Sequence, residues 1–378
     1  MKKKYSLILG LSMLLLANRE TKAQTTDDVL NLLINKNLIQ QADADSIRAE
    51  FAIKQQDAKE KQKSFNITGK KAIQISGYTQ VRFQSFQEAG KPDALDIRRA
   101  RLDFRGAITP TWDYRLQLEF ATAPKILDAT ITFKPYDYLK VQAGQFKVPF
   151  SMENLAQSNN MESIDRSQVV EALVARGKDV IGNHNGRDIG LQVFGSAFKL
   201  KEKFILDYFV AGFNGQGINT TDINESKDFA GRIVLHPITG LDIGGSTYIG
   251  FDKIGTPTAK DQVRNRFGGE LAYTWKNLNV KGEYIEGQDA SVKKFGYYAQ
   301  VSYFIFPKKF QILAKYDAFD PDKDKEDKIS NQISNWYIGG LTYFFNEWAK
   351  LAVNYTYKSE KGTKINNDLI SAQAQISF

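Results

Sequence analysis

The sequence predicts an all-β fold, a closed antiparallel transmembrane β-barrel of about 16 strands with a short N-terminal helical segment. Three observations predict it. Apolar and polar residues alternate with a period of two from residue 72 to the C-terminus. Short and long connections alternate between the predicted strands, as in bacterial outer-membrane barrels. The chain also begins with an export signal yet contains no cysteine, so backbone pairing and burial must stabilise it without disulfides.

Residues 1–23 have the parts of a secretory signal peptide. Three lysines, Lys2 to Lys4, precede an apolar run from Leu7 to Ala17, and Thr21 to Ala23 is a plausible cleavage site. The apolar run has about 11 residues, fewer than the roughly 20 that a transmembrane helix needs. We therefore expect an exported protein whose mature chain begins near Gln24.

Charge argues against a nucleic-acid partner. The whole chain has a formal net charge of +8, but residues 1–23 contain five basic side chains and one acidic side chain. The mature chain is then left with a net charge of about +4, too little to indicate nucleic-acid binding.

Enzyme, metal and cofactor sites are also disfavoured. The two histidines, His184 and His236, cannot form a His-rich zinc site. Aspartates alternate from Asp320 to Asp324 like a calcium loop, but Lys325 and Asn331 stand where that loop requires Gly and Glu. We predict no catalytic residues, no metal and no cofactor.

Residues 24–65 form a separate helical segment, which we expect in the periplasm. Apolar residues recur at helical spacing from Val29 to Ile39, and Asp27 or Asp28 can cap the first helix. A second helix is expected from residue 42 to about residue 63, where most side chains are polar or charged. Such a polar helix is a solvated spacer or a weak oligomerisation stalk.

The barrel is assigned to residues 66–378. Its predicted strands are 72–84, 97–108, 111–121, 126–135, 138–149, 187–198, 203–213, 228–237, 240–251, 265–275, 277–287, 293–306, 309–318, 333–345, 348–359 and 367–378.

The connections alternate in length along these strands. The tight turns are 109–110, 135–137, 199–202, 237–240, 276, 307–308 and 346–347. The longer links are 85–96, 151–186, 214–227, 252–264, 319–332 and 359–366, and 121–125 is a modest exception. A soluble sandwich has no reason to place its short turns at every second connection, whereas an outer-membrane barrel does. We expect both chain ends on the short-turn, periplasmic side.

The strand at 97–108 has two contrasting faces. Arg99, Arg101 and Arg105 lie on one side, and Ala100 and Leu102 lie on the other. This alternation alone suits a soluble core as well as a lipid-facing wall. The C-terminal strand ends in Phe378, similar to the terminal signal of bacterial outer-membrane proteins, so we expect the cell outer membrane as the location.

The candidate functional residues are pore-lining cations that guide anions. They are Arg82, Arg99, Arg101, Arg105, Arg115, Lys140 and Lys147. An alternative is that Asp103, Glu119 and Asp188 neutralise the arginines in a structural network across the wall. Cations outnumber these acids in the patch, so we expect a net positive lumen that concentrates anions.

The longest connection, residues 151–186, follows Pro149, which cannot donate to a strand ladder. It has apolar residues of its own, such as Val169 and Leu173. Folded into the lumen, it would narrow the pore. The alternative is an external flap or a loop that contacts another subunit.

Two segments resemble the phosphate-selective porin O and P family. They are the run from Gly144 to Leu155, GQFKVPFSMENL, and the arginine-rich strand from Arg98 to Gly106. The resemblance covers roughly residues 70–378 and leaves out residues 27–63.

The family resemblance implies a sixteen-stranded, usually trimeric porin with lumen arginines and lysines that guide anions. The expected function is passive diffusion of small solutes, favouring anions such as phosphate, with outer-membrane lipid and a homotrimer as partners. The alternative is a non-transporting outer-membrane barrel that acts as an adhesin or a structural anchor.

Overall fold

In a computed structural model of the chain, the described residues are 26–36, 38, 40–41, 43–48, 65–67, 73–200, 202–222, 225–253, 260–325, 333–361 and 365–378. The chain divides into two compact units, Met1–Gln62 and Lys63–Phe378. The expected signal peptide lies outside the described residues.

The first unit contains helix α2, Thr26–Asn35, and a helical turn at residues 43–48. Leu30 and Ala44 are buried, and Arg48 Nη2 donates to Asn31 Oδ1 at 2.5 Å. The two expected helices are confirmed as far as the described residues reach; residues 49–63 lie outside them. No helix in the described part of the chain is both long enough and apolar enough to cross a bilayer.

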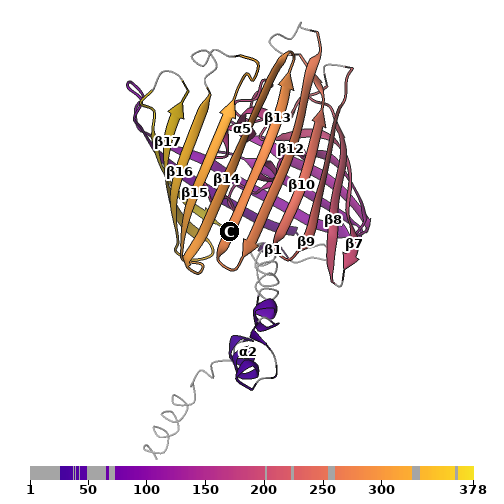
Figure 1. Cartoon of the computed structure of the whole chain (residues 1–378). Helices are drawn as coiled ribbons and strands as arrows, with labels where there is room; N and C mark the ends of the chain where they lie inside the picture. Colours follow the sequence, from indigo (N-terminus) through magenta and orange to yellow (C-terminus); the bar gives the residue numbers. More distant parts are fainter. Residues whose placement is uncertain are drawn as a thin grey trace, which may run out of the picture. The chain divides into compact units, whose positions relative to one another are not determined.

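The second unit is a closed barrel of sixteen long antiparallel strands (Figure 1). They are β2 (Ile73–Phe86), β3 (Ala94–Thr109), β4 (Trp112–Glu119), β5 (Lys125–Tyr136), β6 (Leu139–Lys147), β7 (Arg187–Leu200), β8 (Lys203–Phe213), β9 (Asp228–Ile238), β10 (Leu241–Ile249), β12 (Gln262–Trp275), β13 (Leu278–Asp289), β14 (Val292–Phe306), β15 (Phe310–Asp320), β16 (Ser334–Phe344), β17 (Ala349–Glu360) and β18 (Leu369–Ser377).

The ring closes where β18 pairs with β2. Beyond the last pair of that ladder, Phe378 and Gly77 exchange two backbone hydrogen bonds of 2.9 Å each. The short strand β1, Phe65–Ile67, pairs with the start of β2. Closure leaves no unpaired edge in the ring, as a membrane-spanning sheet requires, and the predicted sixteen-stranded barrel is confirmed.

Two details differ from the sequence prediction. The predicted strand 240–251 is divided into β10 and a short β11, Phe251–Asp252, because the Asp228 carboxylate accepts from Phe251 N and lies against Gly250. The β13–β14 connection is a tight turn at Ala290 and Ser291, although it lies on the side of the long connections.

A β-bulge in β3 also changes which side chains enter the lumen. Gln80 pairs with Arg99, but the next residue, Val81, pairs with Ile97, so Arg98 is the extra residue. Ile97 is 57% exposed on the outer face, whereas Arg98 reaches inward to Asp165. Two consecutive arginines therefore serve the lumen at this point of the strand.

The long connection 151–186, the inner loop, folds into the barrel. It contains two short helices, α4 (Met152–Leu155) and α5 (Gln168–Leu173), and Figure 1 shows α5 behind the front strands. Most of its residues are buried, and they contact inward side chains of strands from β2 round to β18. Only a segment inside the barrel can do so; the alternative of an external flap is wrong.

Candidate functional site: a basic passage beside the inner loop

The inner loop is anchored by wall carboxylates at the starts of its two helices. Glu283 of β13 accepts from the backbone N–H groups of Met152 at 3.0 Å and Glu153 at 2.6 Å. Asp317 of β15 accepts from Gln168 N at 2.9 Å. The first N–H groups of a helix lack partners within it, so these carboxylates satisfy the exposed donors and complement the helix dipole.

A buried ion pair strengthens the first anchor. Lys315 Nζ of β15 lies 2.9 Å from Glu153 Oε1, and both side chains are almost completely buried. Ser167 donates to Glu153 Oε2 through its N–H at 2.8 Å and its hydroxyl at 2.6 Å. Burial by itself would raise the pKa of Glu153, but Lys315 and Ser167 outweigh it and lower the pKa to about 2. The carboxylate is thus charged throughout the physiological range.

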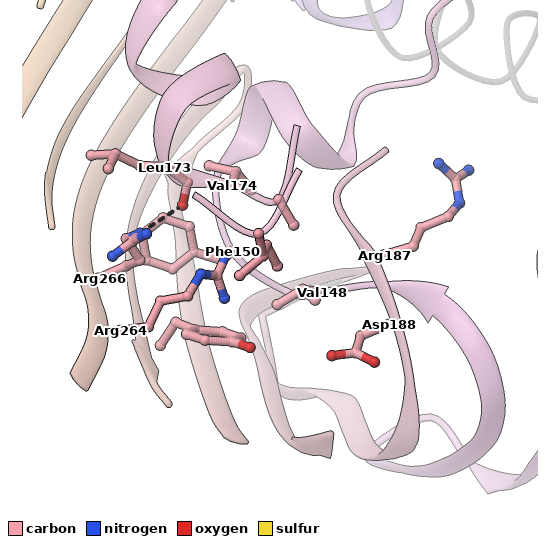
Figure 2. Close-up of a pocket in the computed structure, with 11 residues that line it drawn as sticks. Val148, Phe150, Leu173, Val174, Arg187, Asp188, Arg264 and Arg266 are labelled. Atoms are coloured by element: carbon pink, nitrogen blue, oxygen red, sulfur yellow. Dashed lines mark hydrogen bonds between the residues drawn. The ribbon is translucent and has the colours of Figure 1, made fainter. Parts of the chain in front are cut away.

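Helix α5 packs tightly against the same wall. Val169 and Leu173 belong to the buried apolar cluster. Glycines in the wall allow this close packing, because a Cβ on Gly296 would come within 2.8 Å of Val169. Arg266 Nε donates to Leu173 O at 2.9 Å, beside Phe150 (Figure 2). The cavity among these residues is only about 20 Å³, so this side of the loop is packed shut.

On the opposite side, the loop faces the arginine wall, which we define as strands β2 to β5. Several of its arginines form ion pairs with carboxylates. Arg101 binds Glu119 at 2.7 Å, and both side chains are buried. Arg115 binds both Asp103 at 2.7 Å and Asp128 at 3.1 Å. These pairs fix the guanidinium groups in place and cancel part of their charge.

Other cations near the loop have only neutral partners. Arg99 donates to Gln80 Oε1 at 2.8 Å, and Lys147 Nζ donates to Leu155 O and Ala156 O. Two arginines of the inner loop, Arg166 and Arg176, also donate to neutral oxygens. Among the described residues, none of these four cations has a carboxylate partner, and Arg166 Nη1 is buried with no hydrogen bond. The positive charge here is therefore in excess.

A cavity of about 220 Å³ lies between the loop and the wall. Its lining includes Arg115, Lys147, Gln142 and Gln192, together with Leu155 of the loop. The side chains of Arg105 and Arg115 stay 40% and 31% exposed, so water reaches their guanidinium groups. The cavity is thus lined by cations and amides, together with the Asp128 carboxylate and the rings of Phe146 and Phe209.

The structure places every predicted pore-lining cation on the inner face, but it brings only some together. Arg99, Arg101, Arg105 and Arg115 form one group on β3 and β4. Arg82 binds Asp96 at 2.6 Å and Asp165 at 3.4 Å. On β6, Lys147 joins the passage, and Lys140 lies 5.8 Å from the Phe194 ring.

The proposed neutralising network is present in part and needs one correction. Asp103 and Glu119 bind arginines as expected, but Asp188 accepts from Ile189 N and Gly215 N and binds none of the predicted cations. Asp128, which sequence reasoning missed, takes that role by binding Arg115 and Arg187. Its position at an inward site of β5 could have indicated it.

The family comparison and the structure comparison agree. The family model Phosphate-selective porin O and P matches residues 65–253 and 246–378. No significant match was found among curated protein sequences.

Solved porin structures share the fold at low sequence identity. An anion-selective porin from Comamonas acidovorans is 14% identical with a TM-score of 0.62, over 82% of this chain and 100% of that one. OmpF from Salmonella typhi, in complex with daunomycin, is 12% identical with a TM-score of 0.63, over 83% and 100%. OmpT of Vibrio cholerae, an outer membrane protein, is 11% identical with a TM-score of 0.60, over 82% and 98%.

Proposed function

The chain belongs to the phosphate-selective porin O and P family, and from that premise we propose that its lumen passes small anions in preference to cations. It is an outer-membrane porin, and its family and fold point to a channel rather than an enzyme. The substrate class we propose is small oxyanions such as phosphate, and the assembly we propose is a homotrimer. The similar fold of an anion-selective porin supports the proposal.

One observation carries the selectivity. Arg99, Lys147 and Arg166 lie around the loop with neutral hydrogen-bond partners only, and Lys147 lines the cavity of about 220 Å³. In a narrow, partly desolvated passage, such an excess of fixed positive charge raises the local concentration of anions and repels cations. Guanidinium groups accept phosphate, sulfate and carboxylates by similar paired hydrogen bonds, so we propose a class and not one ion.

The passage runs on one side of the loop. The side toward β13 to β15 is closed by α5 and its apolar contacts, and the side toward β4 to β6 keeps the cavity. Lys147 lines the cavity and also contacts the loop, because its ammonium group donates to the carbonyls of Leu155 and Ala156 at the end of α4. We propose that solutes pass between this lysine and Arg115.

Planar-bilayer recording tests the proposal. In a tenfold KCl gradient across the bilayer, we expect a reversal potential of the sign that anion preference produces. The Lys147→Gln variant should reduce that potential, and Lys308→Gln, which changes an exposed turn, should not. A reversal potential near zero in the wild-type protein would overturn anion preference. Absence of any conductance from well-folded barrels would favour the adhesin or anchor alternative instead.

A further inference from the structure

A second group of cations lies near the end of the lumen that carries the long connections. Trp336 of β16 and Lys358 of β17 are directly opposite each other in the strand ladder. Both face inward, because they alternate with the outward Tyr337 and Tyr357 and share a face with the buried Ile338 and Thr356. Trp336 lies only two residues from Ser334, where β16 begins.

Two ammonium groups from different parts of the chain converge on this tryptophan. Lys358 Nζ is 5.0 Å from the centre of the Trp336 ring, and Nζ of Lys178, in the inner loop, is 5.1 Å from it. Lys178 is exposed, and Lys358 is half-buried. The ring is attracted to each cation, whereas the two cations repel each other.

Neither lysine has a carboxylate partner within the part of the chain that the structure describes. The acids Glu171 and Glu360 hydrogen-bond to neutral groups, since Glu171 accepts from Gly177 N at 3.2 Å and Glu360 accepts from Asn367 Nδ2 at 2.6 Å, and neither forms an ion pair with these lysines. Lys91, in the β2–β3 connection, is paired with Glu88 at 3.5 Å, so Lys178 and Lys358 are the two ammonium groups beside this tryptophan that have no ion pair in the described part of the chain.

We propose that Lys178, Lys358 and Trp336 form an oxyanion-binding site at the outer mouth of the lumen, which collects phosphate and similar anions before they reach the passage at Lys147. The long connections face outward in outer-membrane barrels, so a solute from outside meets this site first. An oxyanion placed between the two ammonium groups relieves their repulsion and accepts hydrogen bonds from both. This inference rests on the proposed anion passage and adds where the anion is first bound.

The site also links the inner loop to the wall. Lys178 follows α5, and Gln168 at the start of that helix donates to Ser334 O at 3.3 Å. The loop anchor thus sets the distance between Lys178 and Lys358. A bound anion and a docked loop stabilise the same arrangement.

Tryptophan emission offers a direct test. Replacing Trp112, Trp275 and Trp348 with Phe leaves Trp336 as the only tryptophan of the chain. In detergent-solubilised protein at low ionic strength, inorganic phosphate should change the emission of Trp336 in a saturable way. Lys178→Gln with Lys358→Gln should raise the half-saturating phosphate concentration about tenfold, because two hydrogen-bonding charges are lost.

A matched control is available at the other end of the barrel. Lys276 lies 5.0 Å from the Trp275 ring, the same cation–π geometry but with a single lysine. A protein that keeps only Trp275 should show no saturable response to phosphate. Equal responses from Trp275 and Trp336, or no response from Trp336 in the folded protein, would overturn the outer site.

Conductance separates this inference from the proposed function. The Lys178→Gln, Lys358→Gln protein should conduct phosphate severalfold less than wild type at low salt and equally well at high salt, where charges are screened. Its reversal potential should keep the anion-selective sign set by the passage. An anion-selective wild type whose phosphate conductance is unchanged in the double variant would overturn the outer site alone. A wild type without anion preference would overturn the proposed function.

Discussion

The two walls of the lumen touch the same loop in opposite ways. The anchoring wall, which we define as strands β12 to β15, offers carboxylates to backbone N–H groups and glycines to apolar side chains. The arginine wall, β2 to β5, offers guanidinium groups, many of them held by carboxylates of the same wall. The first backbone N–H groups of each loop helix have no acceptor within the helix. The wall that the helices contact therefore supplies carboxylates as acceptors. The opposite wall is left with an excess of cations, and the difference makes the lumen asymmetric.

Breaking the anchor should give the largest effect. Lys315→Met leaves Glu153 buried without its counter-charge, which costs about 3–5 kcal/mol. We expect the inner loop to leave the lumen for part of the time, so single-channel conductance rises severalfold and becomes noisier. The control is Lys323→Met, whose partner Glu286 is exposed. Wild-type conductance in a folded Lys315→Met protein would contradict the anchoring role.

Reversing charge on the arginine wall should change selectivity without moving the loop. Arg99→Glu together with Arg105→Glu changes the wall by about four charge units, each acting within a Debye length of roughly 8 Å. Anion preference should fall sharply or reverse in a salt gradient, while the size of the open channel stays similar.

Arg101 serves as the contrasting position on the same strand. Arg105 pairs with Asp103 but stays 40% exposed, whereas Arg101 and its partner Glu119 are both buried. Arg101→Glu would therefore place two carboxylates together away from water, so folded yield should fall instead of selectivity. An unchanged anion-to-cation ratio in the Arg99→Glu, Arg105→Glu protein would place those side chains outside the conduction path.

The outer face of the arginine wall should respond to charge in a different way. Leu102 faces outward on β3, where the Phe378 ring and Leu102 both lie close to Gly77. Leu102→Arg should destabilise the inserted barrel by about 2–4 kcal/mol if it lies near the midplane. Heat-modifiability on gels measures the folded fraction. Arg99→Leu changes the opposite, inner face of the same strand and should insert normally. An equal loss of folded protein in the two variants would contradict the assignment of faces.

The N-terminal unit should have the smallest effect. The chain divides into two separately compact units, and the barrel ring closes through β18 and β2 within the second unit. A chain that lacks residues 24–62 but keeps the signal peptide should insert, conduct and select as the full chain does. A deletion protein that folds but has altered conductance would show that this unit reaches the channel.

Much of the barrel could be predicted because its signals are local. A period of two marks each strand, and turn residues mark its end, so the predicted strand limits lie within three residues of the observed ones. The bulge at Arg98 escaped prediction, because one extra residue reverses the alternation without changing composition. The roles of Asp128 and Arg166 were not predicted either. Asp128 binds Arg187, which is 59 residues away, and the contacts of Arg166 exist only in the folded loop.

The sequence by itself determined the barrel, its strand order and the two faces of each strand. Those properties follow from alternation along a single strand and from the lengths of neighbouring connections. The tertiary structure alone decided which cations are neutralised and where the lumen stays open. Charge compensation and burial depend on distances of a few ångströms between residues far apart in sequence, such as Glu153 and Lys315. No periodicity within a strand can specify such distances.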